Sequence, residues 1–349
     1  MHVTLLYGKF PLNNTARLKR YKMDSSTARR LSSVLRLVRN YNWEDEEFCS
    51  NKAQVCAELS SIVYEDVDEY ELKNASRIHL FASESFRDLV NKKKVNSLQL
   101  NANELEGQFF ISRGAYASVL GVVTGDVVIL AVRGTVKTSL WDWKTNIDSR
   151  KYRIKRSLYN VLLFGEDTVY YDLDDMYFHR GFFEAIVPQF ESIAKEIKSR
   201  SPTGVKTGRK LIWCGHSLGG AMAAIGYAIS ASNLFKLNPD MTIHSRVVNA
   251  YTFGMPRYCG LGATCHFPNP YHIFRKGDIV PTLPMRKMGF SDSRTEYELT
   301  DTGEIVSGLR TDAFGVLGHV PKLVRSIQYH SIEGYAELLA KVTGIPRPV

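Results

Sequence analysis

The sequence predicts one α/β domain in which helices flank a central, mostly parallel β-sheet. Apolar segments typical of strands alternate with helical segments from residue 108 onward. A short apolar strand at 211–214 leads into a glycine-rich turn and then into a helix near residue 221. No linker or composition shift marks a second domain among the 349 residues, and one large α/β domain can account for that length.

Residues 1–50 are predicted to be a basic N-terminal extension that precedes the α/β domain at 51–349. Between residues 15 and 40 the sequence has eight Lys and Arg residues and one acidic residue, Asp24. This composition suits a solvated basic helix, and it is also found in organelle transit sequences and membrane-surface helices. The first nine residues lack the apolar core of a secretory signal.

The elements before the glycine-rich turn follow from apolar periodicity and turn residues. They are helices at 53–64 and 83–94, strands at 109–111, 115–123 and 127–132, a short amphipathic helix at 140–148, and a helix at 183–200. The turn residues Thr124-Gly125-Asp126 predict that the second and third strands form a hairpin. Residues 150–178 are an insertion, basic and then acidic, to which no element is assigned.

The elements after the turn complete the sheet and its helices. They are strands at 247–253 and 271–274, a second hairpin at 294–299 and 304–306, and a C-terminal helix at 332–342. The second hairpin is indicated by the turn residues Thr300-Asp301-Thr302-Gly303 between its strands.

The strongest functional signal is the turn itself, Gly215-His216-Ser217-Leu218-Gly219-Gly220. A serine between glycines at a strand-to-helix turn is the pattern of a nucleophile elbow. The glycines allow a sharp turn and close packing of strand on helix. The helix N-terminus beneath the serine favours developing negative charge. Ser217 is therefore the candidate nucleophile.

A serine nucleophile needs a histidine base and an acid that orients it, and in this type of fold they follow in the order Ser, acid, His. Asp278 comes just after an expected strand, which makes it the first candidate acid; Asp240 is a weaker rival in a Pro-Asp turn. His330 stands directly before the last helix and is preferred as the base over His319.

Several segments in this order resemble the class 3 (fungal-type) lipases, a branch of the α/β-hydrolases. The segments are Ala131-Val132-Arg133-Gly134-Thr135, His179-Arg180-Gly181-Phe182, the elbow at 215–220, Thr252-Phe253-Gly254-Met255-Pro256-Arg257, Gly277-Asp278-Ile279-Val280-Pro281-Thr282-Leu283-Pro284, and His330 with Tyr335. The resemblance covers about residues 50–345. It implies an α/β-hydrolase fold with Ser217 as nucleophile, Asp278 as orienting acid and His330 as general base.

The resemblance also implies an oxyanion hole and a lid. The oxyanion hole maps onto the backbone N–H of Leu218 and onto the backbone N–H and hydroxyl of Thr135. The lid maps onto Leu140, Trp141 and Trp143, which come just after the Arg-Gly-Thr strand. Tryptophan suits a water–lipid interface. The alternative is that both tryptophan rings belong to the core.

The implied function is a serine carboxylic-ester hydrolase that acts on acylglycerols or on the acyl chains of phospholipids through an acyl-enzyme. This chemistry needs no metal and no cofactor, and the carboxylates at 166–175 lack EF-hand spacing. One alternative is an esterase of soluble feruloyl or short-chain esters. Another is a non-catalytic lipase-like signalling protein, although such proteins commonly lose a triad residue and this chain keeps all three.

Charge and cysteine content bear on partners and location. The chain has 45 Lys+Arg against 36 Asp+Glu, a net charge of +9. We expect peripheral association with an anionic lipid surface rather than with nucleic acid, because no basic stripe is interleaved with aromatic residues. No apolar run is long enough to span a membrane, so a cytoplasmic or peripheral-membrane location is expected. The five cysteines are not a disulfide framework. Whether Cys259 pairs with Cys265, and the oligomeric state, are left open.

Overall fold

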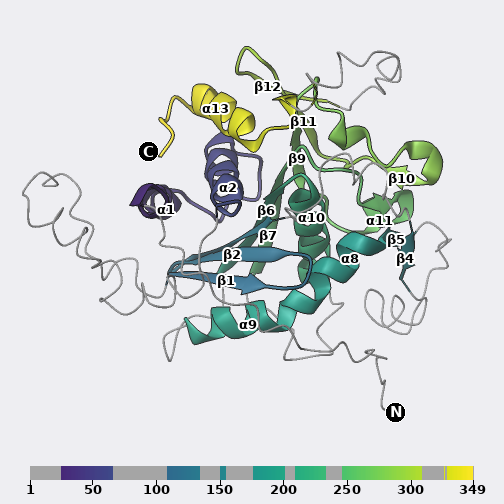
Figure 1. Ribbon diagram of the computed structural model, residues 1–349, viewed down its shortest axis with the longest axis horizontal. Coiled ribbons are helices and arrows are strands. Elements are labelled where there is room, and N and C mark those ends of the chain that lie inside the picture. Colours follow the sequence, from purple (N-terminus) through teal and green to yellow (C-terminus); the bar gives the residue numbers. More distant parts are fainter. Residues whose placement is uncertain are drawn as a thin grey trace, which may run out of the picture.

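The computed structural model describes residues 25–65, 108–133, 150–154, 176–200, 209–232, 246–308, 326 and 328–348. Its centre is an eight-stranded sheet (Figure 1). In spatial order its strands are β1 (Phe109–Arg113), β2 (Ser118–Val123), β3 (Val127–Arg133), β6 (Lys210–His216), β7 (Arg246–Phe253), β9 (Tyr271–Phe274), β11 (Glu296–Leu299) and β12 (Ile305–Ser307). Neighbours from β3 to β11 are parallel, and β1, β2 and β12 join as antiparallel edges. The predicted mostly parallel sheet and both predicted hairpins are confirmed.

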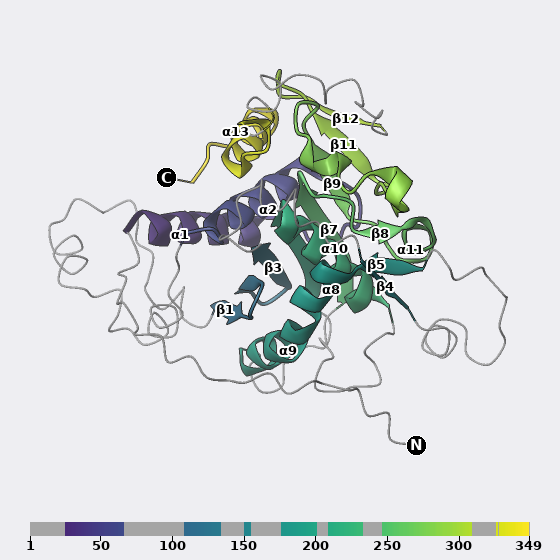
Figure 2. The same ribbon diagram turned by 45° about the vertical axis from the view of Figure 1, so that its right-hand side comes forward.

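Helices cover both faces of this sheet (Figures 1 and 2). One face carries α2 (Ser50–Ile62), with α1 (Ser25–Asn40) and α13 (Ile332–Thr343) packed against it. The other face carries α10 (Leu218–Ala231), together with α8 (Arg180–Ile186) and α9 (Phe190–Ser199). The fold therefore has three layers, with the mostly parallel sheet between two layers of helices, as the sequence predicts.

The single helix predicted over 183–200 is wrong, because the structure divides it in two. A 3₁₀ turn, η2 (Val187–Gln189), separates α8 from α9. Pro188 lies in this turn. A proline has no N–H to donate, and its ring clashes with the carbonyl of the preceding helical turn. The apolar periodicity continues across the break, so the pattern alone did not reveal it.

Helix α1 lies within the expected N-terminal extension but is part of the domain's core. Leu31, Val34, Leu35 and Val38 are buried in one cluster with residues of α2 and of the sheet. Their spacing places them on one helical face. This face gives α1 a place in the fold that the basic composition of residues 15–40 did not predict. The domain boundary at residue 50 stays a prediction.

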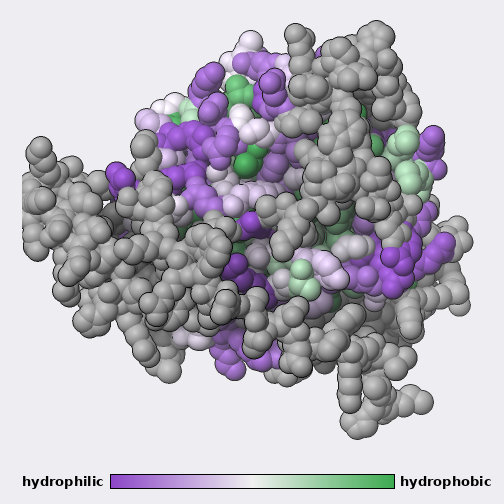
Figure 3. All heavy atoms as spheres, in the orientation of Figure 1, coloured by the Kyte–Doolittle hydropathy of each residue, from purple (hydrophilic) through white to green (hydrophobic). Residues whose placement is uncertain are grey.

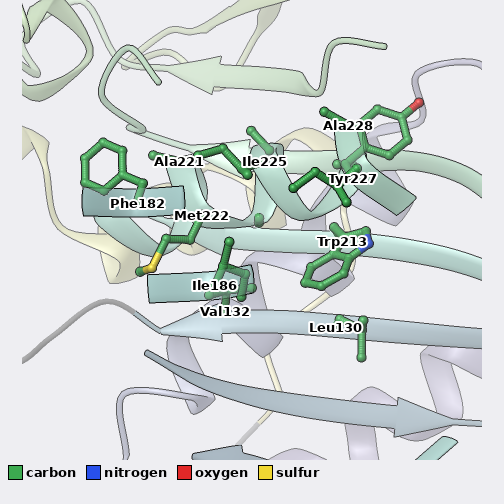
Figure 4. Close-up of a cluster of buried hydrophobic side chains, with 14 of the residues drawn as sticks. Leu130, Val132, Phe182, Ile186, Trp213, Ala221, Met222, Ile225, Tyr227 and Ala228 are labelled. Atoms are coloured by element: carbon green, nitrogen blue, oxygen red, sulfur yellow. The ribbon is translucent and has the colours of Figure 1, made fainter. Parts of the chain in front are cut away.

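Buried hydrophobic side chains fill the layer between the sheet and α10, the helix that follows the elbow (Figure 4). Trp213 of β6 is fully buried against α10, and its indole N–H donates to Ser230 Oγ at 3.2 Å. Gly226 makes this approach possible, since a Cβ there would lie 2.8 Å from the Trp213 ring. Strand β6 and helix α10 are thus packed in close contact on either side of Ser217.

A smaller four-stranded sheet lies beside the main one. Its strands are, in spatial order, β10 (Phe290–Ser291), β8 (Cys259–Gly260), β5 (Tyr177–His179) and β4 (Lys151–Arg153). Strands β4 and β5 pair antiparallel, so the two ends of the expected insertion meet. Cys259 of β8 is buried and Cys265 of α11 (Leu261–His266) is exposed, and both are free thiols.

The surface of the described residues on the face in Figure 3 is mostly hydrophilic. Over all the described residues, the large exposed hydrophobic side chains lie on separate segments: Tyr116, Tyr152, Leu261 and Val306. No described helix combines the length and the apolar character needed to cross a membrane. Within the same described ranges, no group of three or more His, Cys, Asp or Glu side chains could hold a metal ion.

Candidate active site

Ser217 occupies a strained turn between β6 and α10. Its φ is +57° and its ψ is −130°, and it is the single non-glycine residue with positive φ in the described part of the chain. Gly215 leaves room for this tight turn, since a Cβ there would lie 2.5 Å from the backbone of Gly219. The backbone N–H of Ser217 donates to the Phe253 carbonyl of β7 at 3.0 Å. Strain of this kind persists only where the surroundings enforce it, and it is the hallmark of a nucleophile elbow.

Two further side chains meet Ser217 in a continuous hydrogen-bonded row. His330 Nε2 lies 2.8 Å from Ser217 Oγ, and His330 Nδ1 lies 2.8 Å from Asp278 Oδ2. A carboxylate accepts, so Nδ1 carries the proton and Nε2 is free to accept from the serine hydroxyl. All three residues are buried, with 8%, 5% and 5% of Ser217, Asp278 and His330 exposed. This arrangement can take a proton from the serine without solvent.

The carboxylate of Asp278 is held from two further directions. The Tyr335 hydroxyl in α13 donates to Oδ2 at 2.8 Å, and the Val280 N–H donates to Oδ1 at 2.9 Å. Burial, and then the Asp278 charge, raise the pKa of Tyr335 well above its ordinary value, so the hydroxyl remains a donor. The backbone N–H of Arg275 donates in turn to the Tyr335 oxygen at 3.1 Å. Tyr335 therefore fixes the orientation of the acid.

The backbone of His330 is held by the residue that precedes the candidate nucleophile. His216 Nε2–H donates to the His330 carbonyl at 2.6 Å, and the Tyr64 hydroxyl donates to the His216 carbonyl at 3.2 Å. Burial, and then the neighbouring His330, hold the pKa of His216 well below its ordinary value. The sequence marked His216 only as the variable position of the elbow. Its hydrogen bond joins segments that are distant in the chain and gives no local signal.

Gly254 packs directly against the side chains of the acid and the base. Its φ is +53°, and a Cβ there would lie 2.5 Å from Asp278 Oδ2 and 3.1 Å from His330 Nδ1. Both the backbone conformation and the space therefore require glycine. The sequence pattern contained Gly254 in a family motif but gave it no role.

We expect Gly254→Ala to lower kcat about 100-fold, because the methyl group would push Asp278 away from His330 and small displacements at a reacting centre are costly. The matched control is Gly344→Ala. Gly344 also has positive φ, +68°, but a Cβ there meets nothing within 4 Å. The control isolates the backbone cost of about 1–2 kcal/mol. Kinetics and thermal midpoints of both variants test the prediction, and equal kcat values would contradict it.

The remaining predicted site residues lie in two groups. Leu218 opens α10, and a backbone N–H in the first turn of a helix has no intrahelical acceptor, as an oxyanion donor requires. Thr135, Leu140, Trp141 and Trp143 lie outside the described residues. The helices predicted at 83–94 and 140–148 also lie outside them.

Comparison with known proteins identifies the segment around this site. The sequence profile of the family described as Lipase (class 3) matches residues 129–288. The chain carries a class 3 lipase segment. The predicted resemblance is thus confirmed over these residues, which include Ser217 and Asp278. His330 lies beyond the matched residues.

Two curated relatives share part of the chain. Toxin TseL of Vibrio cholerae is 23% identical over 205 residues, which are 52% of this chain and 30% of the toxin. Triacylglycerol lipase OBL1 of Arabidopsis thaliana is 26% identical over 182 residues, 46% of this chain and 34% of that protein. The chain thus matches about a third of the length of each relative. Among solved structures, lipase II from Rhizopus niveus is 18% identical with a TM-score of 0.41, covering 76% of this chain and 94% of that one.

Proposed function

We propose that this chain is a serine hydrolase of carboxylic esters of lipids, with acylglycerols or the acyl chains of phospholipids as substrates. The observation that carries the proposal is the row of hydrogen bonds from Asp278 through His330 to Ser217 on a strained elbow. The class 3 lipase match supports a lipid ester as the substrate. One of the relatives is named a triacylglycerol lipase, in keeping with this substrate class.

The proposed mechanism is acyl transfer through Ser217. Its Oγ attacks the ester carbonyl carbon as His330 Nε2 takes the hydroxyl proton, and Asp278 stabilises the imidazolium that forms. His330 then gives this proton to the leaving alcohol, and the acyl-enzyme remains. Water repeats the sequence: it gives a proton to His330 and attacks the acyl carbon, and His330 then gives that proton to Ser217 Oγ as the carboxylic acid leaves. No metal or cofactor takes part in these steps.

The tetrahedral oxyanion needs donors placed before the reaction begins. In this proposal they are the backbone N–H of Leu218, at the N-terminus of α10, and Thr135, which the resemblance assigns. The α10 helix adds a favourable field at that end. Removal of one such donor typically costs about 3–4 kcal/mol in the transition state.

A panel of esters tests the proposal and separates its alternatives. Fatty-acid release is measured from triacylglycerol, diacylglycerol and phospholipid, and from soluble feruloyl and short-chain esters, with a fluorophosphonate probe for Ser217. A lipase should accelerate above the solubility limit of its substrate. Rates that stop rising there would favour the soluble esterase. Absence of both turnover and labelling would favour the non-catalytic signalling protein.

We further propose that basic residues near the N-terminus draw the protein to anionic lipid. Arg29, Arg36 and Arg39 are exposed on α1, and each basic residue near such a surface contributes about 1 kcal/mol. We expect salt-sensitive binding to phosphatidylserine vesicles, weakened in the triple Arg→Gln variant and on deletion of residues 1–24. A deletion through residue 40 would remove core side chains of α1, so it is not a suitable test. Phosphatidylcholine vesicles are the control, and salt-independent binding would contradict the proposal.

A further inference from the structure

A buried row of polar residues crosses three strands of the central sheet. His272 of β9 is paired in register with Thr252 of β7 on one side and with Glu296 of β11 on the other. These residues are 1%, 0% and 3% exposed, respectively. Burial of polar and charged groups costs free energy unless hydrogen bonds satisfy them. The hydrogen bonds of these side chains therefore indicate what the row does in the fold.

The partners of the His272 ring determine its protonation state. The backbone N–H of Met255 donates to Nε2 at 3.2 Å, so Nε2 has no proton. Nδ1 lies 3.1 Å from Glu296 Oε1 and donates its proton to that carboxylate. A backbone N–H cannot accept, and a carboxylate cannot donate. The ring is therefore held as the neutral Nδ1–H tautomer, with Glu296 fixing its orientation.

The hydrogen bond to Met255 acts where the sheet ladder ends. Just after β7, the Gly254 N–H donates to the Ile273 carbonyl of β9 at 3.0 Å, which continues the pairing of these two strands. Gly254 then turns with positive φ, which leaves the next N–H, that of Met255, without a strand acceptor. His272 supplies that acceptor, so it sets the direction in which the chain leaves β7.

This turn contacts every part of the candidate triad. The Phe253 carbonyl accepts the Ser217 N–H at 3.0 Å. The Cα of Gly254 faces the Asp278–His330 pair so closely that a Cβ would collide with it. The Cβ of Met255 would lie only 2.8 Å from a Cβ on Gly220, one of the glycines of the elbow. A shift of the turn would therefore change the geometry among nucleophile, base and acid.

We infer that His272, oriented by Glu296, is a positioning residue for the triad. It holds the Gly254–Met255 turn in the position that keeps His330 within hydrogen-bond distance of Ser217. The inference rests on the proposed serine-hydrolase function. His272 acts on the triad through the Met255 N–H. A variant that folds normally but lacks the acceptor for the Met255 N–H should have a lower kcat and an unchanged KM.

Two amide variants separate the two hydrogen bonds of the ring. Gln at 272 places an amide oxygen near the position of Nε2 and can accept from Met255, whereas Asn places an amide N–H near Nδ1 and can serve only Glu296. We expect His272→Asn to lower kcat for a p-nitrophenyl ester about 10- to 100-fold with KM within about twofold, and His272→Gln to keep kcat within about threefold. The rate of fluorophosphonate labelling of Ser217 should fall in parallel with kcat.

Glu296→Gln is a second test, which can be used if His272→Asn does not fold. It preserves the size and hydrogen bonding of the side chain and removes the charge that selects the tautomer of His272. We expect a fall of a fewfold in kcat at an unchanged thermal midpoint. Equal kcat in the Asn and Gln variants at residue 272, or an unchanged kcat in Glu296→Gln, would overturn the positioning role. A wild-type chain that is neither labelled at Ser217 nor active would instead refute the proposed function itself.

Discussion

Ser217→Ala is expected to lower kcat for ester hydrolysis by about a million-fold, because removal of a triad nucleophile costs that much in comparable hydrolases. Only residual stabilisation by oxyanion donors would remain. The fold should persist, since the Ser217 hydroxyl is hydrogen-bonded to His330 and the elbow itself is held by backbone packing. The measurement is fatty-acid release by purified protein, with the thermal midpoint as the test of folding.

Ser199→Ala is the matched control for this loss. Ser199 is exposed in α9, and its hydroxyl donates to the Glu196 carbonyl and accepts from Arg200 at the end of that helix. Its replacement should leave kcat unchanged. Comparable fatty-acid release by the wild-type protein and by Ser217→Ala would contradict the assignment of Ser217 as the nucleophile.

Asp278→Asn is expected to lower kcat about ten-thousand-fold, the cost that accompanies the wrong histidine tautomer in a triad. In the native site Oδ2 accepts from both His330 Nδ1–H and the Tyr335 hydroxyl. The Asn side chain could place an N–H toward Nδ1, which would put the ring proton on Nε2, where it cannot take the proton of Ser217. KM should change little, because the Asp278 carboxylate is buried and hydrogen-bonded to His330 and Tyr335.

Asp240→Asn serves as the companion variant, because Asp240 was the rival acid that the sequence alone left open. We expect it to keep the wild-type kcat. Measurement of both variants over a range of pH, together with their thermal midpoints, tests the assignment. A large loss in Asp240→Asn with normal turnover in Asp278→Asn would reverse it.

The local features of this protein could be read from its sequence. The apolar segment before Ser217, the glycines around it and the helix after it are all within a few residues of one another, so short-range sterics and periodicity predict the elbow. The hairpins around Gly125 and Gly303 follow from turn residues for the same reason. The order of Ser217, Asp278 and His330 also agreed with one fold class.

Contacts between distant segments were decided only by the tertiary structure. His330 meets Asp278 across 52 positions of sequence, and the ring of His216 reaches the His330 carbonyl across 114. The burial of α1 likewise depends on what that helix packs against.

The sequence by itself therefore determined the class of fold and the residue best suited to be a nucleophile, because both follow from local backbone preferences. The tertiary structure alone showed that Gly254 lies beneath the acid and base and that His272 accepts from the Met255 N–H. The physical reason is that a hydrogen bond or a close contact depends on the positions of two groups in space. Packing of the whole sheet and its helices sets those positions, and no periodicity within one segment encodes them.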